Sequence, residues 1–260
     1  MPQLPLYSAY IFDLDGTVYL GDRLLPGAAE AISRLRELGR RTIFLSNNPT
    51  HTRDEYAAKL SRLGLATPAG DILNSSMVMV DFLQREMPGA CLFVCGEQAL
   101  CGELRRGGFE LTEDARATDA VIASFDRTFV YRKLQIAFDA IRAGARFFAT
   151  NGDRYCPVPG GGEPDAAAII AAIEACTNRK VEAVVGKPSR YMTDAILSLV
   201  KTPPADCILV GDRLETDVQM GLAAGMSTAL VLTGATRREM VPESDIRPAF
   251  VLESLFELVA

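Results

Sequence analysis

Short apolar runs alternate along the chain with stretches in which apolar side chains recur every three or four residues. The apolar runs are rich in branched residues and predict buried strands at residues 7–12, 42–45, 207–210 and 228–232. The helical spacing predicts helices at residues 27–38, 50–63 and 189–199. Gly39 is expected to end the first helix, and the candidate N-caps of the others are Thr50 or Thr52 and Ser189. This alternation predicts an α/β fold with a doubly wound parallel sheet.

The middle of the chain repeats the same alternation. Strands are predicted at residues 91–94, 120–124 and 146–149, and helices at residues 76–84, 97–105, 131–141 and 165–175. Residues 151–164 are rich in glycine and proline and are predicted to form a connecting loop. These strands are too many for one sheet. We therefore predict a Rossmann-like core formed by residues 1–77 and 184–260, with an inserted α/β domain formed by residues 78–183.

Charge and cysteine usage narrow the class of protein. The 260 residues carry 27 Lys and Arg against 33 Asp and Glu, and a net charge of −6 argues against nucleic-acid or anionic-membrane partners. The apolar runs are far shorter than the roughly 20 residues of a membrane span, and the N-terminus has no secretory signal pattern, so a cytoplasmic protein is expected. The six cysteines form no Cys-x-x-Cys pair and His51 is the only histidine, which argues against a zinc site and a disulfide framework.

Two carboxylates end the first predicted strand. Residues 12–17 read Phe-Asp-Leu-Asp-Gly-Thr, so Asp13 and Asp15 are expected at the carboxyl edge of the sheet, where open α/β sheets bind ligands. A calcium loop also begins with Asp-x-Asp, but it needs glycine at its sixth place and glutamate at its twelfth. Val18 and Leu24 occupy those places, which favours metal or phosphate chemistry of another kind.

Polar residues also follow the second strand and precede a later helix. Ser46, Asn47 and Asn48 offer a hydroxyl, amides and backbone N–H groups to an anion. Lys187 lies ahead of a capped helix, but a nucleotide phosphate loop is excluded because Val181 stands where that loop needs glycine. Taken alone, each segment is explained better by an ordinary structural role, helix capping for residues 46–48 and a solvated side chain for Lys187.

A fourth segment, residues 211–217 (GDRLETD), carries two more acids. Asp212 ends a predicted buried strand, and Asp217 is expected in the first turn of the next helix. Such a pair suggests a hard cation held by oxygen ligands. All four segments are expected at one edge of the same sheet. Three carboxylates, a hydroxyl and a lysine that converge there suit Mg²⁺ and phosphate.

Together, the motifs DLDGT, LSNN, GKP and GDRLETD resemble those of the haloacid dehalogenase superfamily of aspartate-nucleophile phosphatases. Their order, the tract YLGDRLLPG at residues 19–27 and the large insertion look like the branch of p-nitrophenyl phosphatases and ribonucleotide monophosphatases (NagD-like). The resemblance spans essentially the whole chain. It implies Mg²⁺-dependent hydrolysis of small phosphate monoesters, such as sugar phosphates or nucleoside monophosphates, with the inserted domain as a cap over the site.

The resemblance also implies a role for each matching residue. Asp13 matches the nucleophile that forms an aspartyl phosphate, and Asp15 matches the general acid and base. The groups that match Mg²⁺ ligands are Asp13, the backbone carbonyl of Asp15 and Asp212, with Asp217 supporting from near the metal. The residues that match phosphate-binding groups are Ser46, Asn47, Asn48 and Lys187. In the cap, the candidate selectors of the leaving group are Arg154, Tyr155, Glu163 and Asp165, in the loop at residues 151–165.

Two alternatives stay open beside hydrolysis. A phosphomutase would use the same aspartyl phosphate and return the phosphoryl group to a sugar, so accumulation of free phosphate separates the two. A non-catalytic phosphate-binding module is the other alternative, although neither Asp13 nor Asp15 is missing. The expected partner is a small-molecule phosphate ester rather than a nucleic acid or a membrane, and a homodimer is left open.

Overall fold

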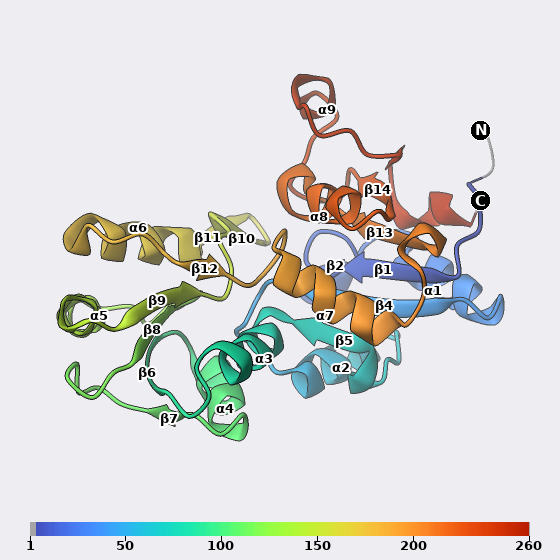
Figure 1. Cartoon of the computed structure of the whole chain (residues 1–260). Coiled ribbons are helices and arrows are strands. Elements are labelled where there is room, and N and C mark those ends of the chain that lie inside the picture. The colour runs from blue at the N-terminus through green and yellow to red at the C-terminus, as the bar shows by residue number, and fades with distance from the viewer. Residues whose placement is uncertain (1–3, 260) are drawn as a thin grey trace.

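The structure, a computed structural model, describes residues 4–259 and contains two parallel sheets, each covered by helices (Figure 1). The larger sheet has six strands in the order β15-β14-β13-β1-β4-β5. Its strands are β1 (Ala9–Asp13), β4 (Arg41–Ser46), β5 (Ile72–Asn74), β13 (Cys207–Gly211), β14 (Ser227–Val231) and β15 (Phe250–Leu252). Every pairing in this sheet is parallel, so all six strands end at the same edge. The predicted doubly wound α/β fold is confirmed.

Helices cover both faces of the six-stranded sheet. These helices are α1 (Ala28–Glu37), α2 (Arg53–Arg62), α3 (Ser75–Glu86), α7 (Arg190–Val200) and α8 (Gln219–Ala223); a short helix α9 (Met240–Glu243) and a hairpin of β2 (Tyr19–Leu20) and β3 (Arg23–Leu24) lie outside the layers. Along β1, Ile11 packs into one apolar cluster with α3, α7 and α8, whereas Tyr10 and Phe12 pack into another with α1 and α2. Because both faces are buried, the central strands are apolar at almost every position.

The second sheet lies within the insertion. It has five strands in the order β12-β9-β8-β6-β7. Its elements are β6 (Cys91–Cys95), α4 (Gln98–Arg106), β7 (Glu110–Leu111), β8 (Ala120–Ala123), α5 (Tyr131–Ala143), β9 (Arg146–Ala149), α6 (Ala166–Thr177) and β12 (Ala183–Val184). The last strand, β12, runs one residue beyond the boundary predicted at residue 183. The exact limits of the inserted domain stay a prediction.

The helix predictions fit the structure closely, including their caps. Thr52 accepts a hydrogen bond from the backbone N–H of Glu55 and completes a capping box, and Ser189 accepts one from Met192. The alternative cap Thr50 is wrong, because its N–H and hydroxyl both donate to Asn48 Oδ1 in the preceding turn. Gly39 follows the first helix with a φ of 70°, a value that favours glycine.

The stretch predicted as a connecting loop, residues 151–164, contains a hairpin instead. β10 (Tyr155–Val158) pairs antiparallel with β11 (Gly161–Pro164). Gly160 has a φ of 86° in the turn between them, which explains why glycines are needed there. The strands were missed because proline and glycine interrupt the alternation that marks a strand. This hairpin carries cap residues to the carboxyl edge of the larger sheet.

One apolar cluster joins the two sheets. It contains Ile43 of β4, Phe82 of α3 and Phe148 of β9. The ring centroid of Phe82 lies 5.1 Å from that of Phe148 and 4.9 Å from that of Tyr191, both in edge-to-face geometry. The shared cluster fixes the insertion against the core. In residues 4–259, no helix is long and apolar enough to span a bilayer.

We predict that Phe82→Ala destabilises the whole protein by about 3–5 kcal/mol, because it leaves a cavity where the two sheets meet. Denaturation in urea, followed by circular dichroism, measures this free energy of unfolding. Tyr131→Ala is the control, since Tyr131 is 78% exposed and its loss should cost less than about 0.5 kcal/mol. A cost below about 1 kcal/mol for Phe82→Ala would contradict a shared core.

Candidate active site

The site begins where β1 ends. Asp13 is the last residue of β1, and Thr17 Oγ1 donates a hydrogen bond to its Oδ2 atom at 3.2 Å. Between them, Gly16 has a φ of 89°, and a Cβ atom there would lie 2.6 Å from Asp212 Oδ2. The glycine of the DLDGT motif therefore turns the chain and leaves room for the neighbouring carboxylate.

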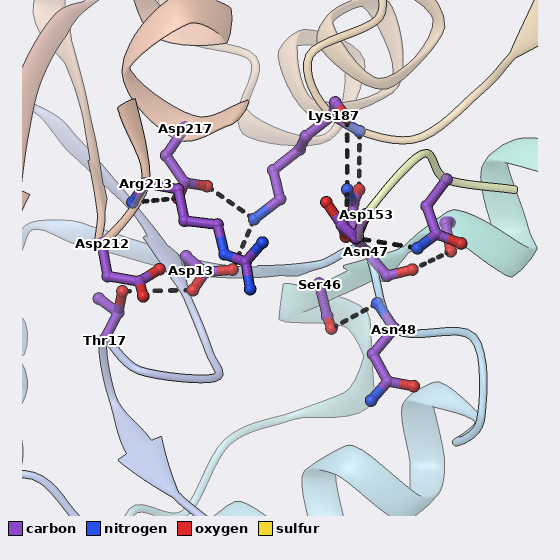
Figure 2. Close-up of polar contacts among 12 residues, drawn as sticks. Asp13, Thr17, Ser46, Asn47, Asn48, Asp153, Lys187, Asp212, Arg213 and Asp217 are labelled. Atoms are coloured by element: carbon purple, nitrogen blue, oxygen red, sulfur yellow. Dashed lines mark hydrogen bonds and ion pairs between the residues drawn. The ribbon is translucent and has the colours of Figure 1, made fainter. Parts of the chain in front are cut away.

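Lys187 lies at the centre of the site (Figure 2). Its Nζ atom donates to Asp13 Oδ1 at 2.5 Å and to Asp217 Oδ1 at 2.6 Å, and the residue is 4% exposed. Burial alone would lower the pKa of Lys187, but the charges and hydrogen bonds of Asp13 and Asp217 outweigh it and raise this pKa, so the ammonium stays charged.

Three buried carboxylates surround this single ammonium. Oxygens of Asp13, Asp212 and Asp217 lie within 4.8 Å of one another. Burial raises the pKa of Asp13 well above its ordinary value; Lys187 opposes this, and the charges of the other two acids add to it. Burial and the charge of Asp217 raise the pKa of Asp212 to about 7. When all three acids are ionised, two negative charges remain uncompensated, which matches one divalent cation with oxygen ligands.

The GDRLETD segment holds its two acids by backbone geometry. Asp217 lies in a π-helical turn (Leu214–Val218), and its Oδ2 atom accepts from Arg213 N at 3.1 Å. A Cβ atom on Gly211 would lie 2.2 Å from Asp217 Cγ, so only glycine fits ahead of Asp212. Asp212 Oδ2 accepts from the N–H of Ala235 at 2.6 Å.

The LSNN segment ends β4 beside Lys187. Asn47 Oδ1 accepts from Lys187 N at 2.7 Å, and Asn47 Nδ2 donates to Lys187 O at 3.3 Å, so the amide clamps the lysine peptide. Ser46 Oγ accepts from Asn48 N at 3.1 Å and hydrogen-bonds Tyr56 Oη at 3.2 Å. Asn48 uses its side chain to hold the following turn. Of these three side chains, that of Asn47 contacts Lys187, whereas those of Ser46 and Asn48 hold the turn after β4.

The general-acid candidate, Asp15, has a different environment. Burial raises its pKa to about 6, although the charges of Lys59 and Lys187 lower it. Asp15 is outside the cluster of side-chain oxygens formed by Asp13, Asp212 and Asp217. A carboxyl group with this pKa is able to give and take a proton near neutral pH.

The insertion contributes the opposite wall. Asp153 Oδ2 accepts from Asn47 Nδ2 at 2.9 Å, and the carbonyl of Tyr155 accepts from Arg213 Nη2 at 2.9 Å. Asp165 accepts from Asn151 Nδ2 at 3.0 Å, and burial raises its pKa to about 7. These contacts enclose a cavity of about 40 Å³ over Asp13, which we call the inner chamber.

All the site residues predicted from the core motifs line the inner chamber: Asp13, Asp15, Ser46, Asn47, Asn48, Lys187, Asp212 and Asp217. Of the four predicted selectors, Tyr155 and Asp165 also line it, and Arg154 lines a neighbouring cavity. Glu163 lines neither cavity; its Oε2 atom lies 3.8 Å from Arg127 Nη1.

Sequence reasoning overlooked three residues. Thr17 and Arg213 lie inside motifs that were recognised, DLDGT and GDRLETD, and this position was the only signal they carried. Asp153 lies in the loop predicted to select the leaving group, but no local pattern marks its contact with Asn47, which joins residues 106 positions apart. It depends on how the insertion folds back over the core.

Known proteins match both the sequence and this fold. Residues 10–110 match the family described as haloacid dehalogenase-like hydrolase, and residues 184–258 match a second model described as HAD-hydrolase-like. The sugar-phosphatase AraL of Bacillus subtilis is 38% identical, with 95% of this chain and 90% of that protein covered. Human chronophin is 34% identical, with 95% and 90% covered.

Solved structures agree. The 4-nitrophenylphosphatase of Thermotoga maritima superimposes with a TM-score of 0.92 at 35% identity, covering 97% of this chain and 96% of that one. NagD of Escherichia coli superimposes with a TM-score of 0.87 at 32% identity, covering 97% and 98%. The chain therefore belongs to the haloacid dehalogenase-like hydrolases. Its α/β core, with acidic residues at the strand ends beneath an inserted domain, has the architecture of that class. Within that family it is a NagD-like phosphatase.

We predict that Mg²⁺ stabilises the protein more strongly as pH rises through about 7, because protons compete with the cation for carboxylates of raised pKa. Without a cation, the stability that these acids contribute is complete below about pH 4 and is lost as pH rises through about 7. Thermal unfolding in Mg²⁺ and in EDTA, from about pH 5 to 8, measures the difference in Tm. At an Mg²⁺ concentration one hundred times Kd, the difference in Tm should reach about 5–10 °C.

Asp212→Asn should remove this difference at every pH, whereas Asp139→Asn, which changes an exposed acid on α5, should keep it. A Tm difference that is independent of pH, or that survives in Asp212→Asn, would contradict cation binding by the cluster.

Proposed function

We propose that this phosphatase hydrolyses small phosphate monoesters, sugar phosphates among them, through an aspartyl phosphate on Asp13. The observation that carries the proposal is the inner chamber itself, in which one buried ammonium neutralises only part of three buried carboxylates. The names of two relatives, sugar-phosphatase AraL and acid sugar phosphatase, support the substrate class.

Asp13 is the proposed nucleophile. Its Oδ2 atom is held by Thr17 and its Oδ1 atom by Lys187, so the carboxylate is fixed in orientation before the substrate arrives. Attack on phosphorus would form an acyl phosphate and release the alcohol, which divides hydrolysis into two easier steps. Fixed orientation is valuable here, since phosphoryl transfer depends chiefly on in-line positioning and charge neutralisation.

Asp15 would move the proton in both steps. As a carboxylic acid with a pKa of about 6, it can protonate the departing oxygen. The resulting carboxylate can then take a proton from the water that hydrolyses the acyl phosphate. Its position two residues after Asp13 keeps it beside the reacting group without sharing the ammonium of Lys187.

The remaining core residues would hold the phosphoryl oxygens and the metal. Ser46 and Lys187 supply a hydroxyl and a positive charge, and Asn47 acts through its clamp on the Lys187 peptide. Asp13, the backbone carbonyl of Asp15 and Asp212 would hold Mg²⁺, with Asp217 supporting. When bound, Mg²⁺ supplies the charge that lets an acidic site accept a dianionic ester.

We predict that purified protein releases phosphate from p-nitrophenyl phosphate in Mg²⁺ and not in EDTA. Asp13→Asn should reduce the rate to background, and Asp15→Asn should lower kcat about 10²–10⁴-fold, because the water that hydrolyses the acyl phosphate loses its general base. Asp139→Asn serves as the matched control on an exposed helix and should behave as wild type.

Free phosphate must appear in step with nitrophenol. If nitrophenol is released but the phosphoryl group passes to an added sugar in place of water, the phosphomutase alternative replaces hydrolysis. Full activity in Asp13→Asn would refute the proposed nucleophile.

A further inference from the structure

A second cavity adjoins the inner chamber, and its lining comes from both the insertion and the core. It has a volume of about 270 Å³, and we call it the outer chamber. Four residues line both cavities, namely Asp153, Tyr155, Arg213 and Thr216. The two chambers are therefore separated by a wall one side chain thick, with Asp13 and Lys187 on the inner side only.

The inner chamber is too small for a whole substrate. A cavity needs about 10–15 Å³ to hold one water. The inner chamber, at about 40 Å³, accommodates a group of a few non-hydrogen atoms, which is the size of a phosphoryl group. The alcohol part of an ester attached to that group therefore lies outside the inner chamber.

Arg213 and Tyr155 form that wall, one from the core and one from the insertion. Arg213 Nη2 donates to the carbonyl of Tyr155 at 2.9 Å, and its guanidinium carbon lies 4.9 Å from the centroid of the Tyr155 ring. In the view of Figure 2 the guanidinium group is drawn in front of Asp13. A group that crosses from one chamber to the other passes these two side chains.

The lining of the outer chamber mixes hydrogen-bond donors and acceptors. Arg154 and Arg213 donate, Glu215 and Asp153 accept, and the hydroxyl of Thr236 does both. Neither sign of charge predominates, which disfavours a second phosphate or a carboxylate on the leaving group. A polyhydroxylated group satisfies such a lining best, because each of its hydroxyls can donate and accept.

We propose that the outer chamber binds the leaving group as a single sugar unit, and that Arg213 is a specificity-determining residue at its entrance. This inference rests on the proposed function and deepens it. The volume of about 270 Å³ is large enough for one monosaccharide. A nucleoside is disfavoured by the lining rather than by the volume, because its base would need an aromatic face on which to stack. Tyr155 is its only aromatic wall, and the guanidinium of Arg213 already lies against that ring.

Met240 offers a test that leaves the inner chamber intact. It lines the outer chamber only, and it is 41% exposed, so Met240→Trp fills the chamber from its rim. The substrates are a hexose 6-phosphate and acetyl phosphate, whose acetyl group is small enough to need little of the outer chamber. Leu222→Trp is the matched control, because Leu222 is 46% exposed on α8.

We predict that Met240→Trp lowers kcat/KM for the hexose phosphate by about tenfold or more and leaves that for acetyl phosphate within about twofold. Leu222→Trp should change neither. Equal loss on both substrates, or no loss on either, would overturn the assignment of the outer chamber. Failure of wild type to release phosphate from any ester would instead overturn the proposed function.

Glu215→Gln and Arg213→Met extend the test if Met240→Trp does not fold. Glu215→Gln removes the negative charge of this side chain and replaces one of its two acceptor oxygens with a donor, so it should raise KM for the hexose phosphate with no change for acetyl phosphate. Arg213→Met opens the wall and should narrow the preference for the hexose phosphate over a nucleoside 5′-monophosphate. An unchanged preference in Arg213→Met would remove Arg213 from the selection of the leaving group.

Discussion

The buried contact of Lys187 with Asp13 and Asp217 is the constraint on which the rest of the site depends. An ammonium group that is 4% exposed is stable only because two carboxylates lie within 2.6 Å of it. The same contact draws β1, the GKP segment and the π-helical turn after β13 to one point. Because Asp212 brings a further negative charge to that point, the site is left with excess negative charge, and this excess is what a divalent cation would neutralise.

Small residues and hydrogen bonds keep that arrangement in place. Gly211 and Gly234 allow Asp217 and Asp212 to approach the backbone more closely than a Cβ atom would permit. Gly186 does the same for the Asn47 clamp, since a Cβ atom there would lie 2.7 Å from Asn47 Oδ1. On the other side, the apolar cluster around Phe82 sets the inserted sheet against the core. The hairpin β10–β11 then brings Tyr155 over the carboxylates.

The sequence alone predicted the fold of the core and the residues around Asp13, because these depend on local patterns. Buried parallel strands are apolar throughout, and the candidate site residues lie within a few residues of the end of a strand. Other features could not be predicted. β5 and β15 have three residues each and are too short to give a periodic signal. The hairpin β10–β11 contains prolines, which interrupt the alternation that predicts a strand. The contact between Asp153 and Asn47 depends on the placement of the cap, which no local pattern encodes.

The central claim is that Asp13 carries the phosphoryl group during turnover. Rapid acid quench of Asp15→Asn with substrate, followed by peptide mass spectrometry, tests it directly, because loss of the base should slow hydrolysis of the acyl phosphate and let it accumulate. The account predicts a phosphoryl adduct on the peptide that contains Asp13, and its absence when Asp13 is also changed to Asn. Turnover with no adduct on that peptide, or with an adduct on another residue, would contradict it.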